Sequence, residues 1–236
     1  MTNSEWLEVI SAMEEVAPYY DRVNQLITFG LADRWRAEVA ARAKPDDVVL
    51  EMGSGPGTFA RHLDVKQAYC LEPSGQLVEL SKGLMRERGF DLIRGVGENV
   101  PLPDESVDKV FCSFSFRDFR DRESGAIEMF RVLRTGGEVF IADVAKPPPS
   151  PLSRLLQMHV RHVVPMMARM AVHPSVRSRW KNDPYRKFVE TYDAFGFTTV
   201  YEKLLKEKGF EDISTEFLRM KGATMTRGKK PWKSTS

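Results

Sequence analysis

Hydrophobic and polar positions along the chain change their period several times, and the first period is helical. Residues 4–16 place apolar side chains at helical spacing, and Pro18 ends this run because a residue before proline avoids the helical backbone region. A second helix is expected to begin near Asp33, its cap, with Trp35 and Val39 facing inward. The chain is therefore predicted to open with helices.

Short apolar runs follow, and amphipathic helical stretches separate them. The expected strands are residues 48–50, 68–71, 92–94, 109–114 and 139–142, and the expected helices between them include residues 77–85 and 126–133. We expect Gly89 to end the first of these helices in a left-handed cap, and Gly136 with Gly137 to end the second. Because such alternation makes parallel crossovers, the pattern predicts a doubly wound, Rossmann-like α/β sheet.

Residues 147–196 break the alternation. They begin with a proline-rich run and continue through a methionine-rich helical stretch, which predicts an inserted helical cap. A helix over 200–208, closed by Gly209, and strands over 210–218 and 222–226 then complete a seven-stranded sheet. We expect one domain, composed of an N-terminal helical segment 1–44, a mostly parallel core 45–146 and 197–230 with an antiparallel last strand, and the cap.

The composition argues against a nucleic-acid-binding, secreted or membrane-spanning protein. The chain has 236 residues, is 42% hydrophobic and 29% charged, and carries a formal net charge of +2, which is ordinary for a cytoplasmic enzyme and gives no basis for a nucleic-acid partner. Cys70 and Cys112 lie in predicted strands, where free thiols behave as small hydrophobes in a reducing compartment. The acidic N-terminus is unlike a secretory signal, and no apolar run is long enough to span a bilayer.

The main chemical motif follows the first strand and reads Glu51-Met-Gly-Ser-Gly-Pro-Gly57. Gly53, Gly55 and Gly57 allow a ligand to approach the main chain closely, with Ser54 between the first two. The dinucleotide pattern requires glycine where Thr58 stands, which weakens the dehydrogenase interpretation. Glu51 would repel a pyrophosphate but attract the cationic end of S-adenosylmethionine. The loop alone could still be only a tight turn.

The second expected strand also ends in an acid. Glu72 lies at about the distance from the loop at which a carboxylate accepts hydrogen bonds from ribose hydroxyls, and Pro73 follows it. The alternative is that Glu72 and its neighbours only open the next helix, where acids are favoured. The pair of acids strengthens the prediction of a methyl-donor site.

Several further motifs are spread over nearly the whole chain. They are Val16–Asn24, Phe29–Arg36, Val100–Asp104, Phe114–Asp118, Arg131–Gly137, Pro151–Ser153, His162–Pro165 and Gly222–Lys229. Together they resemble the quinone-ring C-methyltransferases of ubiquinone and menaquinone biosynthesis. The resemblance implies a class I methyltransferase fold, S-adenosylmethionine as cofactor, and a reduced, hydrophobic quinol as substrate, with demethylmenaquinol as first choice.

The resemblance also implies roles for single residues. Arg117 would stabilise a developing phenolate, since a guanidinium keeps its proton, and either Asp118 or His162 would accept the proton. Tyr20 would close over the donor, and Ser113 would meet it at the end of the fourth strand. Arg117 and Asp118 could instead form a local ion pair, and His162 could be a histidine of the cap without chemistry.

Three departures from the family pattern limit this transfer. Val96 stands where the family usually has a polar residue beside adenine, so backbone groups of Val96 and Gly97 must bind the adenine instead. Asp118 replaces an asparagine, which makes the identity of the quinone less secure. Glu51 and Glu72 replace shorter aspartates but keep the charge, which we regard as neutral for function.

The sequence of the cap does not decide which partners it contacts. Its methionine-rich stretch 152–172 could roof an isoprenoid tail or be ordinary core. Arg154, Arg161, His162 and Arg169, together with the basic tail 227–230, would allow peripheral contact with acidic lipid headgroups, and a homodimer is left open. Two alternative hypotheses for the function are a methyltransferase of another small hydrophobic phenol or amine, and an S-adenosylmethionine-binding scaffold without turnover.

Overall fold

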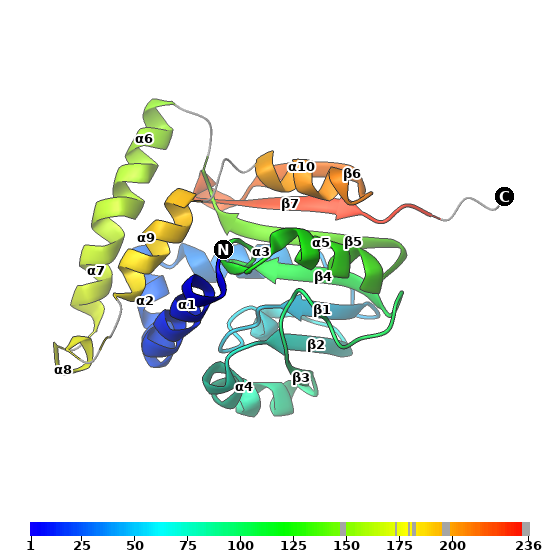
Figure 1. The fold of residues 1–236 in the computed structure, drawn as a ribbon, viewed down its shortest axis with the longest axis horizontal. Helices are drawn as coiled ribbons and strands as arrows, with labels where there is room; N and C mark the ends of the chain where they lie inside the picture. Colours follow the sequence, from blue (N-terminus) through cyan, green and yellow to red (C-terminus); the bar gives the residue numbers. More distant parts are fainter. Residues whose placement is uncertain (147–149, 173, 179, 181–182, 195–198, 233–236) are drawn as a thin grey trace.

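A computed structural model describes the chain except for residues 147–149, 173, 179, 181–182, 195–198 and 233–236 (Figure 1). The first three prolines of the run expected to open the cap, residues 147–149, therefore lie outside the described residues, whereas Pro151 begins a helix. The strands are β1 Val48–Met52, β2 Gln67–Glu72, β3 Asp91–Arg94, β4 Val107–Ser113, β5 Leu133–Val144, β6 Glu211–Phe217 and β7 Ala223–Lys229. They form one sheet of seven strands.

The sheet has the order β3-β2-β1-β4-β5-β7-β6. The first five strands in this order pair in parallel, and β7 runs antiparallel to both β5 and β6. This arrangement confirms the predicted fold class. The helices are α1 Asn3–Val16, α2 Tyr20–Ile27, α3 Leu31–Ala40, α4 Gly75–Arg88, α5 Arg122–Val132, α6 Pro151–Met158, α7 Val164–Ala171, α8 Pro174–Arg177, α9 Pro184–Ala194 and α10 Thr199–Glu207.

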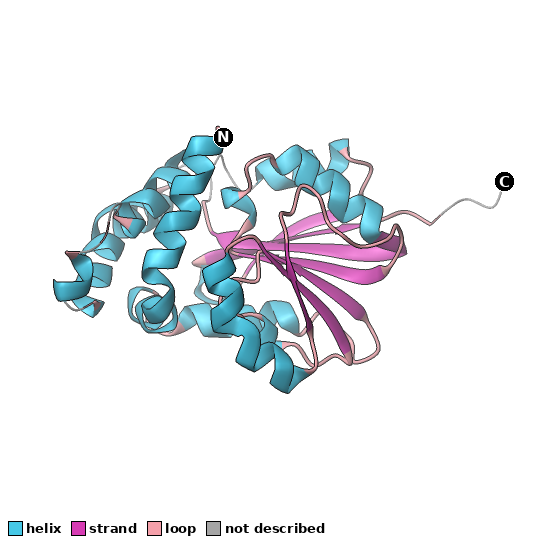
Figure 2. Cartoon of the chain, turned by 60° about the horizontal axis from the view of Figure 1, so that its bottom comes forward, coloured by secondary structure: helices cyan, strands magenta, loops and turns pink. Residues whose placement is uncertain are grey.

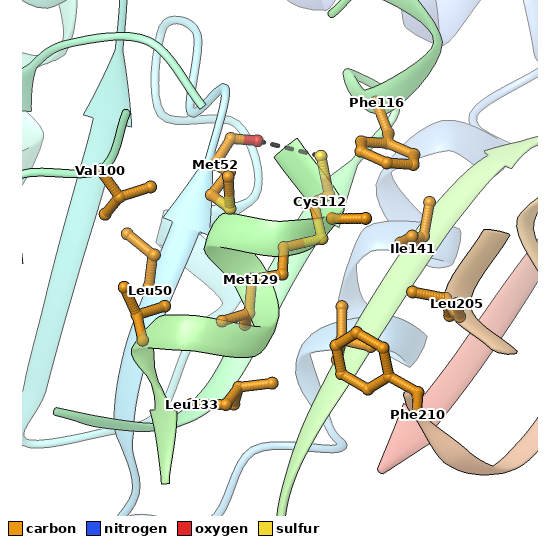
Figure 3. Packing of buried hydrophobic residues seen from close by; sticks show 14 of the residues in the cluster. Leu50, Met52, Val100, Cys112, Phe116, Met129, Leu133, Ile141, Leu205 and Phe210 are labelled. Carbon is orange, nitrogen blue, oxygen red and sulfur yellow. Dashed lines mark hydrogen bonds between the residues drawn. The ribbon is translucent and has the colours of Figure 1, made fainter. Parts of the chain in front are cut away.

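Alternate residues of the strands face two separate cores, as the period of an extended chain requires. Leu50 and Met52 pack on one face with side chains of α5 and α10, and Val49 and Cys70 pack on the other with side chains of α3. Figure 2 shows helices on both faces of the sheet, and Figure 3 shows the first core, where the Cys112 thiol donates to the Met52 carbonyl over 3.3 Å. Both cysteines are buried free thiols, as expected.

A third cluster lies outside the sheet. Val16, Val23 and Ile27 from the N-terminal helices pack against Val164, Ala168 and neighbouring residues of the cap. Figure 1 shows α1, α2, α6, α7 and α9 grouped beyond the carboxyl ends of the parallel strands. None of the helices in the described part of the chain combines the length and apolar character needed to cross a bilayer.

Two predicted helix ends were wrong for physical reasons. α3 begins at Leu31 behind left-handed Gly30, and the Thr28 hydroxyl accepts the Ala32 N–H over 3.0 Å, so Asp33 is not the cap. α5 ends at Val132 and β5 starts at once, so Gly136 lies inside a strand, where its N–H donates to the Lys230 carbonyl over 2.9 Å. The expected glycine cap is confirmed at Gly89, which has φ +69°.

Candidate active site

Two cavities lie beyond the carboxyl ends of the parallel strands, where ligands of doubly wound folds bind. The smaller cavity is bordered by the glycine loop after β1 and by the ends of β2 and β4. The larger cavity, of about 590 Å³, lies between the N-terminal helices and the cap. Met13, Tyr20, Phe114 and Asp118 line both cavities, and we call these four residues the shared wall. A group bound in one cavity can therefore meet a group bound in the other.

The smaller cavity contains buried polar atoms without hydrogen-bond partners among the described residues. They are one carboxylate oxygen of Glu51 and the hydroxyls of Ser54 and Ser113. Burial raises the pKa of Glu51 well above its usual range, while the charge of Arg36 opposes the rise. Because buried polar atoms normally find partners, these three are set for a polar or cationic ligand.

The glycine loop leaves room for that ligand at its centre. Gly55 has φ +55°, and a Cβ built on it would meet no protein atom within 4 Å. Glycine is required at Gly53 for a different reason, because a Cβ there would lie 2.6 Å from Cβ of Ser115. Gly55 therefore faces the open cavity, whereas Gly53 permits close packing of the loop on the end of β4.

Glu72 holds the glycine loop as well as lining the cavity. One carboxylate oxygen accepts the Gly55 N–H over 2.8 Å, and the other accepts the N–H of Ser74, the N-cap of α4, over 2.9 Å. Burial raises the pKa of Glu72 to about 7, although these two hydrogen bonds oppose the rise. Glu72 can thus both open α4 and present a carboxylate to a ligand, the two roles that the sequence analysis kept apart. Pro73 lines the cavity beside it.

Val96 and Gly97 also line the smaller cavity. Gly97 is buried, and a Cβ on it would lie 2.1 Å from the Phe119 ring. The main chain therefore comes into direct contact with an aromatic side chain at this point. Val96 and Gly97 therefore line the same cavity as the glycine loop and Glu72, and their role toward adenine stays a prediction.

Arg117 and Asp118 lie after β4 in a short helical turn over Phe116–Asp118. Arg117 donates to the Asp143 carboxylate, lies 3.6 Å from that of Asp118, and places its guanidinium carbon 5.0 Å from the centre of the Phe188 ring. The Arg117 side chain is only 8% exposed, and its Nε–H has no acceptor among the described residues. Burial raises the pKa of Asp118, and the Arg117 charge opposes the rise.

Comparison with known proteins decides the family. The ubiE/COQ5 methyltransferase family model matches residues 1–230. The chain belongs to the ubiE/COQ5 methyltransferase family. A similar relative is the ubiquinone/menaquinone biosynthesis C-methyltransferase UbiE of Vibrio campbellii, 25% identical over 226 residues, which are 91% of this chain and 84% of the relative. Another is the demethylmenaquinone methyltransferase of Streptomyces griseus, 31% identical over 164 residues, 69% of this chain and 71% of that protein.

Solved structures agree on the fold. A SAM-dependent methyltransferase of Thermotoga maritima has a TM-score of 0.62 at 21% identity, with 94% of this chain and 99% of that chain covered. The phosphoethanolamine N-methyltransferase 2 of Haemonchus contortus, solved with S-adenosyl-L-methionine, has a TM-score of 0.56 at 12% identity, over 80% of this chain and 50% of that one. This member of the ubiE/COQ5 family is an S-adenosylmethionine-dependent methyltransferase.

The polar atoms of the smaller cavity fit this methyl donor. The unpartnered Glu51 oxygen suits the donor's cationic amino group, and the hydroxyls of Ser54 and Ser113 can bind its polar end. Glu72 can accept the ribose hydroxyls, and the backbone at Val96 and Gly97 can bind adenine. Tyr20 belongs to the shared wall, between the two cavities.

Two expectations about charged residues are corrected. His162 is exposed and lines neither cavity, so the structure does not bring it to Arg117 or Asp118. His159, on the same π-helical turn, lines the larger cavity, with Nε2 3.2 Å from the Ile27 carbonyl oxygen. In the basic tail, Arg227 is paired with Glu138, and Lys230 is 7% exposed over the Phe130 ring, at the end of the sheet away from the cap (Figure 1).

Sequence reasoning missed several residues around the shared wall. Asp143 is 1% exposed and accepts from both Arg117 and the Tyr201 hydroxyl, the latter over 2.8 Å. Phe114 has a left-handed backbone with φ +62°, which is strained for a bulky residue. Asp143 could have been predicted as a site residue because it is a lone acid in the apolar run of β5. The left-handed backbone of Phe114 could not be predicted from its residue type.

Proposed function

We propose that this methyltransferase methylates a ring carbon of a reduced quinol with an apolar tail, and that demethylmenaquinol is its preferred substrate. The observation that carries the proposal is the larger cavity, of about 590 Å³, which is mostly apolar but meets the donor cavity at Asp118. An isoprenoid tail requires apolar walls, and a quinol ring requires polar groups at one end. The names of the Vibrio and Streptomyces relatives support the same substrate class.

The chemistry requires a ring carbon made nucleophilic by its neighbouring hydroxyl. Arg117 can donate its unpartnered Nε–H to that oxygen, and Asp118 can take the hydroxyl proton because its raised pKa makes it a better base. The bound donor supplies a methyl group activated by a sulfonium. As the new carbon–carbon bond forms, the carbon–sulfur bond breaks, the ring carbon then loses its hydrogen as a proton, and the ring oxygen regains one. One proton is released overall.

A membrane surface is the proposed source of such a substrate. Four exposed apolar side chains line the larger cavity, and we call them the rim: Phe29, Leu155, Met158 and Met220. Exposed Arg154, Arg219 and Lys221 adjoin the rim along the chain and can contact acidic headgroups. Arg161 and Arg169 contribute less than expected from sequence, since each is paired with an aspartate of the cap.

Labelled donor and a substrate panel test the proposal. Purified protein is incubated under reducing conditions with demethylmenaquinol, a ubiquinol precursor, a simple catechol and a hydrophobic amine. We expect methylation of the quinols and none of the matching oxidised quinone, whose ring carbon is not nucleophilic. Methylation of the amine or catechol alone would replace the proposal with the broader methyltransferase function. Donor binding without turnover on any substrate would leave a binding scaffold.

A further inference from the structure

Arg36 on α3 lines the larger cavity at the shared wall, although the sequence analysis assigned it no role. It is 4% exposed, and its guanidinium carbon lies 5.8 Å from the centre of the Tyr20 ring and 5.4 Å from that of the Phe114 ring. Both rings belong to the shared wall. Stacking on two aromatic faces fixes the position of a guanidinium. The charge is therefore held at the junction between the donor and acceptor cavities.

The two arginines that line the larger cavity differ in how their charge is compensated. Arg117 is bracketed by the carboxylates of Asp143 and Asp118. Arg36 has no carboxylate oxygen within 4.0 Å in the part of the chain that the structure describes, and Glu51 acts on it only at longer range. A buried charge without a close partner destabilises the folded state, because its desolvation is not compensated. A ligand group of opposite charge in the larger cavity would offset that free-energy cost.

We propose that Arg36 is a catalytic residue that contacts the ring oxygen which becomes a phenolate. This role rests on the quinol methylation proposed above. As Asp118 takes the hydroxyl proton, the electron pair left on the oxygen moves into the ring, and the ring carbon bonds to the methyl group while the carbon–sulfur bond breaks. Arg36 makes the hydroxyl more acidic, and Arg117 adds a hydrogen bond and holds Asp118. The net charge at the ring is then supplied mainly by Arg36.

Three variants within one turn of α3 separate this role from packing. Arg36→Leu removes the charge, Arg36→Lys keeps it, and Arg34→Leu removes an exposed arginine of the same helix. Turnover on demethylmenaquinol, donor affinity by calorimetry and thermal unfolding are measured for each. We expect Arg36→Leu to lower kcat about 100-fold, the scale for one transition-state donor, with donor affinity kept. Arg36→Lys is expected to recover part of the loss, and Arg34→Leu to behave as wild type.

A second measurement does not depend on turnover. The compound 2-hydroxy-1,4-naphthoquinone changes its visible absorbance when its ring hydroxyl ionises, so titration of the bound probe reports the local charge. We expect Arg36→Leu to weaken the ionisation constant of the bound probe about tenfold or more, the scale for one nearby opposite charge. Arg117→Leu is expected to change it less, because the Arg117 charge is already compensated.

The possible outcomes are distinct. If Arg36→Leu weakens the ionisation constant of the bound probe about tenfold or more, Arg36 contacts the ionised ring oxygen even when every quinol fails as substrate, and only the proposed reaction falls. If quinol turnover and the ionisation constant of the bound probe are both unchanged in Arg36→Leu, the role of Arg36 is wrong while the reaction stands. A loss of donor affinity as large as the loss of turnover would place Arg36 against the donor's carboxylate instead, and would also overturn the proposal.

Discussion

The two cavities meet at one wall, but the chain builds them in different ways. The smaller cavity is bordered by strand ends, the turns after them and side chains of α1, and it presents three polar atoms without partners among the described residues. The larger cavity is enclosed mainly by apolar side chains of the N-terminal and cap helices. Sheet hydrogen bonds fix the register of the strand ends at the smaller cavity, whereas side-chain packing mainly sets the shape of the larger one. Changes in the smaller cavity are therefore expected to affect donor binding steeply, and changes in the larger one to affect turnover.

Gly55→Val is the strongest test of the fixed donor cavity. Valine is strained in the left-handed backbone of Gly55, and its branched side chain would project into the space where no protein atom lies within 4 Å. We expect donor binding to be abolished in calorimetry. Gly89→Val is the matched control, since Gly89 has φ +69°, equal freedom around its Cβ, and a place at the end of α4 that lines neither cavity. Unchanged donor affinity in folded Gly55→Val would remove the loop from the site.

This contrast also explains which parts could be predicted from sequence. Glu51, Gly55 and Glu72 were found because a strand end, a turn and the next strand end have a fixed spacing in this fold. The residues of the larger cavity come from segments far apart in the chain, so no spacing rule assigned a role to Arg36, although it ends the Phe29–Arg36 motif. His159 and His162 are three positions apart on one helical stretch, and the π-helical turn there alters which face each side chain occupies. A helical pattern could not distinguish them.

Arg117→Leu probes the junction between the two cavities. We expect turnover on demethylmenaquinol to fall about 100-fold, the scale for one transition-state donor, while donor affinity stays nearly unchanged. The variant also leaves Asp143 buried without its cation, which is expected to lower the free energy of unfolding by about 3–5 kcal/mol. Turnover must therefore be expressed per folded molecule. Arg134→Leu, which breaks a surface ion pair with Asp108, serves as control.

The result for Arg117→Leu has two readable outcomes. A fall in turnover per folded molecule, with calorimetric donor affinity close to wild type, supports a role for Arg117 toward the ring. A loss of stability with turnover per folded molecule unchanged would make Arg117 a structural partner of Asp143. In that case the chemistry at the shared wall would depend on Asp118 and Arg36 alone.

Glu72→Ala is expected to have a smaller effect within the donor cavity. The change removes the acceptor for ribose hydroxyls and also the two hydrogen bonds that hold Gly55 and Ser74. We expect donor affinity to weaken by about 1–3 kcal/mol, the usual scale for charge-assisted hydrogen bonds. Glu87→Ala, an exposed acid on α4, is the control. Calorimetric affinity equal to wild type would reject the ribose role and leave Glu72 as a support for the loop.

Near neutral pH, the smallest expected effect is a pH dependence that has opposite signs for donor binding and for stability. Burial raises the pKa of Glu72 to about 7, so the folded protein holds a proton there that the unfolded chain has already lost above its ordinary pKa of 4.5. Between these two values the folded state binds more protons, and the contribution of Glu72 to stability falls as pH rises. Ribose hydroxyls donate to the ionised form, so donor affinity is expected to rise over the same range.

Calorimetric titrations of the donor at several pH values, with wild type and Glu72→Gln, test this sign. Below about pH 7 the donor must first displace the proton from Glu72, so wild-type affinity is expected to fall by up to about tenfold for each further pH unit. Glutamine keeps the shape and one acceptor but cannot ionise, and its profile is expected to be flatter. The donor's own amino group is the same in both experiments, and burial together with the Glu72 charge raises the pKa of Glu51, so the difference between the profiles reports Glu72 together with its effect on Glu51. Parallel profiles would show that Glu72 keeps one protonation state throughout, and the donor cavity would then owe its pH dependence to Glu51.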